Sequence, residues 1–146
     1  MMETEKMKVY ENIWKDQPAE FTKLSHMSQR NGLHMKIAEL VNGSRATNLL
    51  DFGSGDGRLI EMLNPQITVD LYDINPGMIS LAEKRLGGRV HQYYKHLSFL
   101  PIGHYDFVVL NMVLICISTK EEFRQVLTKI FEVKKKAGTL LIGLTH

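Results

Sequence analysis

Residues 49–59 read Leu49-Leu50-Asp51-Phe52-Gly53-Ser54-Gly55-Asp56-Gly57-Arg58-Leu59, an apolar run that ends in an acidic residue and then carries three glycines at alternate positions. The apolar pattern resumes in residues 59–63, which predicts a buried strand, a sharp loop and a helix. Glycine is favoured where the backbone takes a positive φ or lies against a ligand, because a Cβ would clash there. The loop is therefore predicted to hold a ligand, and a glycine-rich turn without a ligand is the alternative.

The charge of this loop narrows the class of ligand. A dinucleotide-binding loop of the form G-x-G-x-x-G offers helix N-terminal amides to a diphosphate. Here the third glycine comes one position early, and Asp51 and Asp56 flank the turn. Two carboxylates would repel a diphosphate but attract a ligand with a sulfonium and an α-ammonium group. We therefore expect a cationic ligand, with a dinucleotide-dependent oxidoreductase as an alternative.

The loop resembles motif I of the class I S-adenosylmethionine (SAM) dependent methyltransferases, which is a hydrophobic run, an acidic residue and then G-x-G-x-G. A second acidic residue, Asp73, ends the apolar segment 67–73 and follows Asp51 by 22 residues. At that separation a β-α-β unit returns its second strand to the same edge of the sheet. The resemblance implies an α/β fold, a Rossmann-like doubly wound sheet with strand order 3-2-1-4-5 preceded by N-terminal helices.

The resemblance also implies which residues bind the cofactor SAM. Asp73 would accept hydrogen bonds from the ribose hydroxyls, and Ile74 would lie against one face of the adenine. After strand three many family members carry an acidic residue that binds the adenine amino group. This chain has Leu97 in that region and no carboxylate, so Leu97 is expected to form the second wall of the adenine slot. The predicted cofactor-binding residues are Asp51, Gly53, Ser54, Gly55, Asp73, Ile74, Leu97 and Asn111.

The fourth predicted strand reads Tyr105-Asp106-Phe107-Val108-Val109-Leu110, a nearly continuous apolar run of the kind found in strands buried on both faces. Asn111 follows at its carboxyl end, where open α/β sheets place groups that contact ligands. Residues 119–133 have a helical pattern with Thr119 as N-cap. The following run Lys134-Lys135-Lys136 is predicted to be a solvated end of that helix.

Residues 139–144 form the fifth predicted strand and are largely apolar. Soluble proteins avoid an exposed edge of that kind because it pairs with other chains. Family members close the sheet with an antiparallel hairpin of strands six and seven, which is missing here. We therefore expect either a truncated protein or a homodimer in which a second chain covers this edge.

Residues 1–43 are predicted to form an N-terminal helical segment that covers the ligand, and residues 44–146 the SAM-binding core. The helical pattern before residue 42 is discontinuous, with a break near Pro18, which predicts two or three helices. Elsewhere the pattern predicts helices at residues 58–63 and 76–86 and an edge strand at residues 89–94.

Composition and charge exclude several classes of function. A net charge of +2 is too small to favour nucleic acid or an anionic membrane. The only cysteine, Cys116, cannot form an internal disulfide, and no Cys/His cluster has the spacing of a metal site. No apolar run reaches the length of a membrane span, and the polar start lacks the core of a signal peptide. We therefore expect a cytoplasmic protein that binds no metal, nucleic acid or membrane.

The activity that the resemblance implies is methyl transfer to an oxygen, nitrogen or carbon atom of a small molecule. An in-line displacement at the sulfonium methyl requires no nucleophilic side chain, so no residue is assigned as catalytic. An oxygen or nitrogen acceptor can require a base to remove its proton. The candidate bases are Tyr10, His26, His34 and His146. The alternative is a SAM-binding fold that has lost catalysis and acts as a partner-binding or regulatory subunit.

Overall fold

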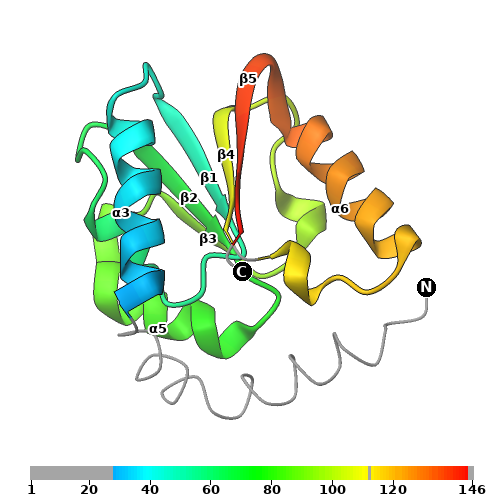
Figure 1. Cartoon of the computed structure of the whole chain (residues 1–146), viewed down its shortest axis with the longest axis horizontal. Coiled ribbons are helices and arrows are strands. Elements are labelled where there is room, and N and C mark those ends of the chain that lie inside the picture. Colours follow the sequence, from blue (N-terminus) through cyan, green and yellow to red (C-terminus); the bar gives the residue numbers. More distant parts are fainter. Residues whose placement is uncertain (1–27, 112, 145–146) are drawn as a thin grey trace.

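A computed structural model of the chain describes residues 28–111 and 113–144. Its helices and strands are, in chain order, α3 (Ser28–Asn42), β1 (Asn48–Phe52), α4 (Arg58–Glu61), β2 (Thr68–Tyr72), α5 (Pro76–Leu86), β3 (Gln92–Tyr94), β4 (Tyr105–Asn111), α6 (Lys120–Val133) and β5 (Lys134–Gly143). Short 3-10 helices lie in the connections: η1 (Gly87–Arg89), η2 (Leu97–Phe99) and η3 (Leu114–Cys116). Figure 1 shows one twisted sheet between these helices.

The strands form one parallel sheet in the order β3-β2-β1-β4-β5 (Figure 1). Phe52 at the end of β1 lies beside Tyr72 of β2 and beside Leu110 of β4. At the end of the next pair, Asn111 of β4 lies beside Gly143 of β5. The ends of the central strands therefore meet at one side of the sheet, here called the carboxyl edge. The predicted Rossmann-like sheet and its strand order are confirmed.

The central strands send alternate side chains into two apolar layers, as strands covered on both faces do. Leu49 of β1 packs into one layer and Leu50 into the other, and both are fully buried. The helices α3, α4 and α5 cover the first face through Ile37, Val41, Leu59, Ile60 and Ala82. The helix α6 covers the second face through Ile130 and Val133 (Figure 1). The sheet is therefore doubly wound, as predicted.

The helix α3 is the described part of the predicted N-terminal helical segment. It packs against the sheet through buried Ile37, Ala38 and Val41, so it is a layer of the core. Three candidate bases lie outside the described residues: Tyr10, His26 and His146. The covering role of residues 1–27 and the division of the chain at residue 44 stay predictions.

Two short elements differ from their predicted bounds. The helix predicted for residues 58–63 ends at Glu61, a difference usual at a helix end. The predicted edge strand 89–94 starts only at Gln92, because residues 87–89 form η1. The guanidinium of Arg89 donates to the carbonyl oxygens of Ile67 and Asn64, both at 3.0 Å. These contacts hold Arg89 against the loop before β2 rather than in the strand.

The lysine run 134–136 directly follows α6. Lys134 is the C-cap of that helix, with its N–H donating to the carbonyl oxygen of Ile130, and Lys135 and Lys136 are exposed, as predicted for a solvated helix end. The same three residues are also the first residues of β5, which the sequence did not predict. Lys134 pairs with Tyr105 as the first residue of β5, after which the register of the two strands shifts. The Nζ of Lys134 donates to the carbonyl oxygens of Lys135 and Gly138, at 2.9 and 3.0 Å. The side chain thus satisfies carbonyls within an irregular part of the strand, where ladder pairing is interrupted.

Two expectations about the surroundings of the chain stay predictions. The strand β5 lies at the edge of the sheet, where Ile142 of the strand and the following Leu144 are exposed, and a homodimer that covers this edge stays a prediction. Among the helices described here, none combines the length and apolar character that a membrane span requires. The cytoplasmic location stays a prediction.

Asp70, in the middle of β2, is a buried carboxylate with a structural role. The hydroxyl of Tyr105 donates to one of its oxygens at 2.6 Å, and Nδ1 of His91 lies 3.0 Å from the other. Burial, followed by the hydrogen bond to Asp70, raises the pKa of Tyr105, so this phenol remains a donor. The hydrogen bond from Tyr105 to Asp70 thereby links the start of β4 to β2, past the intervening strand β1.

Replacing Tyr105 by Phe is expected to lower the free energy of unfolding by about 1–3 kcal/mol, because the buried carboxylate of Asp70 loses a donor. Urea unfolding followed by circular dichroism measures the change. The control is Tyr93→Phe, which removes the hydrogen bond from an exposed hydroxyl to the carbonyl of Gly87 and is expected to lower it by less than about 1 kcal/mol. An equal decrease in the free energy of unfolding of Tyr105→Phe and Tyr93→Phe would contradict the structural role given to Asp70.

Candidate functional site

The loop between β1 and α4 turns back over the end of β2. The backbone N–H groups of Gly53 and Ser54 both donate to the carbonyl oxygen of Tyr72, at 2.7 and 3.0 Å. Gly53 has φ 80°, a left-handed conformation that other residues rarely adopt. The predicted sharp turn is present, and it is attached to the residue directly before Asp73.

Asp73 points back at this glycine loop. Its Oδ2 accepts a hydrogen bond from the N–H of Gly55 at 2.9 Å, and its Oδ1 accepts one from the N–H of Asn75 at 2.8 Å. An ionised carboxylate has further lone pairs after one bond to each oxygen, so a ligand hydroxyl can also donate to it. The structure therefore brings Asp73 to the glycine loop, as the sequence predicts, and its contact with a ribose stays a prediction.

Asp51 and Asp73 form a buried acidic pair whose pKa values lie near neutrality. Burial, followed by the negative charge of Asp73, raises the pKa of Asp51 to about 7. Burial raises the pKa of Asp73 to about 6, although the N–H groups of Asn75 and Gly55 act in the opposite direction. Carboxyl groups with strongly shifted pKa values cluster at functional sites. A cation bound near both would lower both pKa values again.

Asp56 does not offer its charge to this site. Its Oδ2 lies 3.2 Å from Nε of Arg58 and 3.5 Å from a guanidinium nitrogen of Arg85. The expectation that Asp56 flanks the ligand together with Asp51 is therefore not supported by its contacts. The second carboxylate beside Asp51 is Asp73. The sequence signal was ambiguous because Arg85 belongs to α5, far along the chain from Asp56.

Asn111 carries a buried acceptor that lacks a partner at the carboxyl edge. Its Oδ1 makes no hydrogen bond within the described part of the chain. A Cβ on the neighbouring Gly143 would lie 2.5 Å from this oxygen and 3.2 Å from Cδ1 of Ile37, so the glycine leaves the space that the amide occupies. An unpaired buried polar atom costs about 1–3 kcal/mol. Asn111 is thus prepared to accept a hydrogen bond from a ligand, and its role as a ligand contact stays a prediction.

Val113, in the connection from β4 to α6, lies directly on the glycine loop. A Cβ on Gly53 would overlap Cγ2 of Val113, which places the isopropyl group against the α-carbon of Gly53. Sequence reasoning gave Val113 no role, because valine has no chemical signature and only the pairing of β4 with β1 brings it here. A ligand that lies against Gly53 requires this side chain to move.

The other predicted residues take different positions around this centre. Ser54 is half-buried in the loop, and Ile74 is 36% exposed, which leaves its apolar side chain open to a ligand. Leu97 is half-buried in η2 and packs against the second apolar layer. His34, the described candidate base, is 5% exposed on α3. The adenine contacts of Ile74 and Leu97 and the basic role of His34 stay predictions.

The carboxyl edge thus combines several unused hydrogen-bonding groups with two carboxyl groups. The acceptors are Asp51, Asp73 and Asn111, and the buried Nδ2 of Asn75 is a donor that has no partner. This set fits a ligand with hydroxyl groups and a cationic group, whereas a diphosphate would meet two carboxylates.

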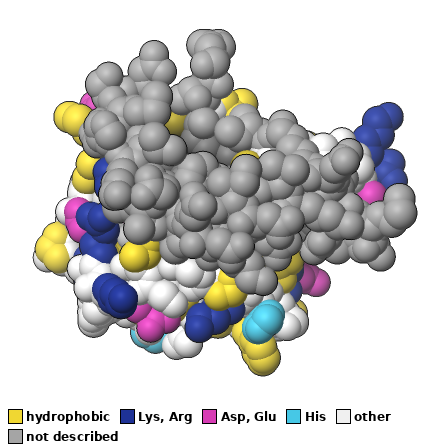
Figure 2. Space-filling view, turned by 90° about the horizontal axis from the view of Figure 1, so that it is seen from below, with side chains coloured by type: hydrophobic (Ala, Val, Ile, Leu, Met, Phe, Trp, Pro, Cys, Tyr) yellow, Lys and Arg dark blue, Asp and Glu magenta, His cyan; other side chains and the backbone are white. Residues whose placement is uncertain are grey.

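The described residues contain no group of three or more His, Cys, Asp or Glu that would hold a metal ion. Figure 2 shows basic, acidic and apolar side chains mixed on the described part of the face that it views.

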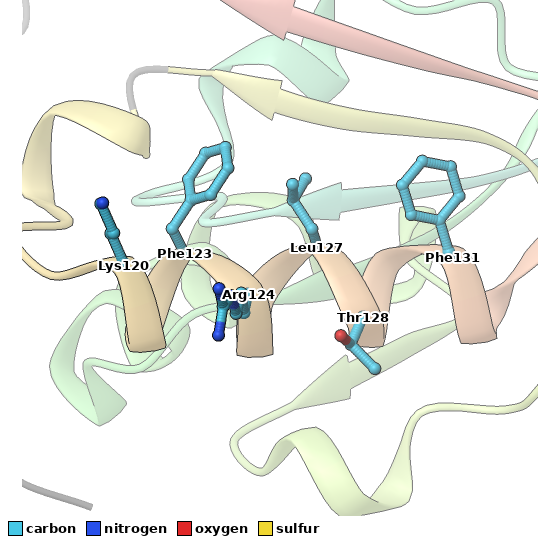
Figure 3. A pocket seen from close by; sticks show the side chains of 6 residues that line it. All are labelled: Lys120, Phe123, Arg124, Leu127, Thr128 and Phe131. Atoms are coloured by element: carbon cyan, nitrogen blue, oxygen red, sulfur yellow. The ribbon is translucent and has the colours of Figure 1, made fainter.

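A separate hollow of about 620 Å³ lies on α6. It is lined by Lys120, Phe123, Arg124, Leu127, Thr128 and Phe131 (Figure 3). Figure 3 shows Phe123, Leu127 and Phe131 pointing to one side of the helix. This hollow contains none of the predicted site residues, so the carboxyl edge remains the candidate site.

The sequence matches a family model described as a methyltransferase domain over residues 50–140. The match begins in β1, ends in β5 and includes the glycine loop, Asp73 and Asn111. No curated protein matches the sequence.

Solved structures share the fold. One is a SAM-dependent methyltransferase from Leishmania major, with TM-score 0.77 and 20% identity over 94% of this chain and 60% of that chain. A second is the N-methyltransferase NodS from Bradyrhizobium japonicum WM9 in complex with S-adenosyl-L-homocysteine, with TM-score 0.72 and 20% identity over 82% of this chain and 64% of that chain. A third is SAM-bound CalS10, an amino pentose methyltransferase from Micromonospora echinaspora, with TM-score 0.68 and 22% identity over 85% of this chain and 54% of that chain. This chain therefore spans less than two thirds of each of the three.

The stability of the chain is expected to fall as the pH rises from about 4 to about 7. The pKa of Asp51 is about 7 in the folded state against 3.8 for a freely exposed aspartate, so between these pH values the folded state holds a proton that the unfolded state has released. Asp51→Asn removes the part of this dependence that comes from Asp51 and leaves the part that comes from the raised pKa of Asp73. Near pH 8 the variant is expected to have a free energy of unfolding higher by on the order of 4 kcal/mol. Near pH 4 the two chains are expected to differ little.

Urea unfolding at several pH values measures this effect. The control is Glu39→Gln, which changes an exposed carboxylate paired with Lys36 on α3 and is expected to have little effect at any pH. Equal stability of Asp51→Asn and the wild-type chain near pH 8 would contradict a raised pKa for Asp51.

Gly53→Ala is expected to destabilise the fold by about 1–3 kcal/mol, through the left-handed backbone and the overlap with Val113. In the double variant with Val113→Ala, the steric part is expected to be relieved and the backbone part to remain, so the two effects are not additive. Thermal unfolding of the four chains measures the coupling. Gly88→Ala is the control, because a Cβ there would meet nothing within 4 Å. Additive effects would show that Val113 does not lie on Gly53.

Proposed function

Because this chain belongs to the methyltransferase domain family, we propose that it binds SAM at the carboxyl edge and transfers its methyl group to a small molecule. The fold is that of the class I SAM-dependent methyltransferases. The observation that carries the proposal is the hydrogen bond from Gly55 to Asp73, with the second buried carboxyl group of Asp51 close enough to interact with it. This arrangement joins the turn of motif I to the acidic residue at the end of β2.

The residues of the carboxyl edge fit the parts of SAM. The carboxylate of Asp73 has lone pairs left for the ribose hydroxyls, and the exposed side chain of Ile74 offers an apolar surface to the adenine. The acidic pair attracts the sulfonium and the α-ammonium group. The free acceptor of Asn111 suits an N–H donor of the ligand. Leu97 is the proposed second wall of the adenine slot.

The transfer of the methyl group requires no nucleophilic side chain of the protein. When bound, SAM supplies a methyl group that is activated by the positive charge of the sulfonium. The chain holds the acceptor in line and keeps bulk water away from the site. The buried His34 of α3 is the proposed base for an acceptor that loses a proton. An oxygen, nitrogen or carbon atom is the proposed acceptor, and the N-methyltransferase and amino pentose methyltransferase among the similar structures support a small molecule.

One observation favours a second candidate, a SAM-binding fold that has lost catalysis and serves as a partner-binding or regulatory subunit. Val113 covers the α-carbon of Gly53, where the ligand of an active enzyme would lie. A chain in which this contact persists would not bind the cofactor and would use its fold for other contacts. The two candidates differ in whether the ligand displaces Val113.

Calorimetric titration of the chain with S-adenosylhomocysteine and with NAD tests the binding step. The thioether is expected to bind and NAD is not, because a diphosphate meets the acidic pair. Asp73→Asn is expected to weaken S-adenosylhomocysteine about tenfold or more, since a hydrogen bond with a charged partner contributes roughly 1.5–3 kcal/mol. The control Glu61→Gln, at the exposed pair with Arg85, is expected to leave affinity unchanged. Transfer of radioactive methyl groups from SAM to a panel of small amines and alcohols then separates an enzyme from a non-catalytic subunit.

Binding of NAD without S-adenosylhomocysteine would overturn the proposal. Binding of neither compound would favour the subunit that has lost catalysis.

A further inference from the structure

Asn75 stands at the start of α5, two residues after Asp73, and its backbone and side chain are both fixed. Its side-chain Oδ1 accepts a hydrogen bond from the N–H of Gly77 at 2.9 Å, which caps the helix, and Pro76 occupies the first helical position. Its own N–H donates to Oδ1 of Asp73 at 2.8 Å. Because the group that accepts from an N–H must be the oxygen, the position of the amide nitrogen is also determined.

This amide nitrogen has no role in the cap. Asn75 is 0% exposed, and its Nδ2 has no hydrogen-bond partner among the residues that the structure describes. Serine, aspartate and threonine also supply a capping oxygen, without an amide nitrogen. Leaving a buried donor unpaired costs about 1–3 kcal/mol, so capping alone does not explain why an amide stands here. A partner that the protein itself does not provide does explain it.

The position of Nδ2 indicates what that partner is. The amide oxygen accepts from the N–H of Gly77, and the backbone N–H of Asn75 donates to Asp73, so the residue lies next to that carboxylate. The helix begins at the carboxyl edge, where Asp73 meets Gly55 (Figure 1). A ribose hydroxyl both donates and accepts. It can therefore donate to Asp73 and accept from Asn75 at the same time.

We propose that Asn75 is a cofactor-binding residue whose Nδ2 donates a hydrogen bond to a ribose hydroxyl that in turn donates to Asp73. The inference rests on the proposed function, because it takes the nucleoside of SAM as the ligand. The hydroxyl then accepts a hydrogen bond from Asn75 and donates one to Asp73. Nδ2 is covered in the structure, as Gly53 is by Val113, so binding also requires the covering side chains to move.

The test separates the cap from the amide nitrogen. Asn75→Ser keeps a capping oxygen and removes Nδ2, so its melting temperature is expected to stay within a few degrees of the wild type. Its affinity for S-adenosylhomocysteine is expected to fall about fivefold to tenfold. The matched control is Thr119→Ser, which keeps the cap of α6 that bonds the N–H of Glu122 at 3.2 Å and is expected to change neither quantity.

Deoxy ligands locate the contact. The 2′-deoxy and 3′-deoxy forms of S-adenosylhomocysteine each lack one hydroxyl, and for one of them Asn75→Ser is expected to cause no further loss of affinity. Unchanged affinity of Asn75→Ser for S-adenosylhomocysteine would overturn the inference. The inference would also be overturned if Asn75→Ser lowered the affinity for both deoxy forms and for the parent compound by the same factor.

A second variant and the wild-type chain keep the outcomes distinct. If Asn75→Ser lowers the melting temperature strongly, Asn75→Asp, which also keeps a capping oxygen, takes its place in the same titrations. If Nδ2 instead bonds a structural water, both variants are expected to have lower melting temperatures but an unchanged affinity for S-adenosylhomocysteine. That result would overturn the inference. A wild-type chain that does not bind S-adenosylhomocysteine would instead contradict the proposed function itself.

Discussion

The hydrogen bond from the N–H of Gly55 to Oδ2 of Asp73 is the contact on which the candidate site depends. It joins a loop that leaves β1 to a residue that ends β2, and it forms only because these strands lie side by side in parallel. The carbonyl of Tyr72 adds two further bonds to the loop from the same strand end. Together these bonds hold the acidic residue over the turn.

The buried acids of this chain show how a functional carboxylate differs from a structural one. Asp70 and Asp56 are as deeply buried as Asp51, but Tyr105 and His91 satisfy the first, and two arginines pair with the second. Burial instead raises the pKa of both Asp51 and Asp73, and the charge of Asp73 raises the pKa of Asp51 further. Amide atoms of Asn75, at the start of α5, and of Asn111, at the end of β4, have no partner among the described residues. Buried carboxyl groups with raised pKa values and buried amide atoms without partners are characteristic of a site that a ligand completes.

The fold was predictable because its signals are local and repeat along the chain. Apolar runs of strand length alternate with helical patterns, and a parallel sheet then allows few topologies. Boundaries were less predictable where a side chain acts over a distance, as when Arg89 bonds carbonyls before β2 and delays the start of β3. The early start of β5 was not predicted, because Lys134 bonds the backbone of its own strand, a contact that charge patterning does not reveal.

By itself the sequence determined the turn at Gly53 and the carboxylates beside the ends of β1 and β2, since glycine conformation and apolar periodicity act through near neighbours. The order of the strands followed from the resemblance to a known family. Only the tertiary structure decided that Asp73 bonds Gly55, that Asp56 belongs to Arg85, that Val113 covers Gly53 and that Asn75 keeps an unpaired donor. Each of these depends on a contact between segments distant in the chain, and a hydrogen bond or a steric contact changes over less than an ångström, a precision that residue types and spacing do not carry.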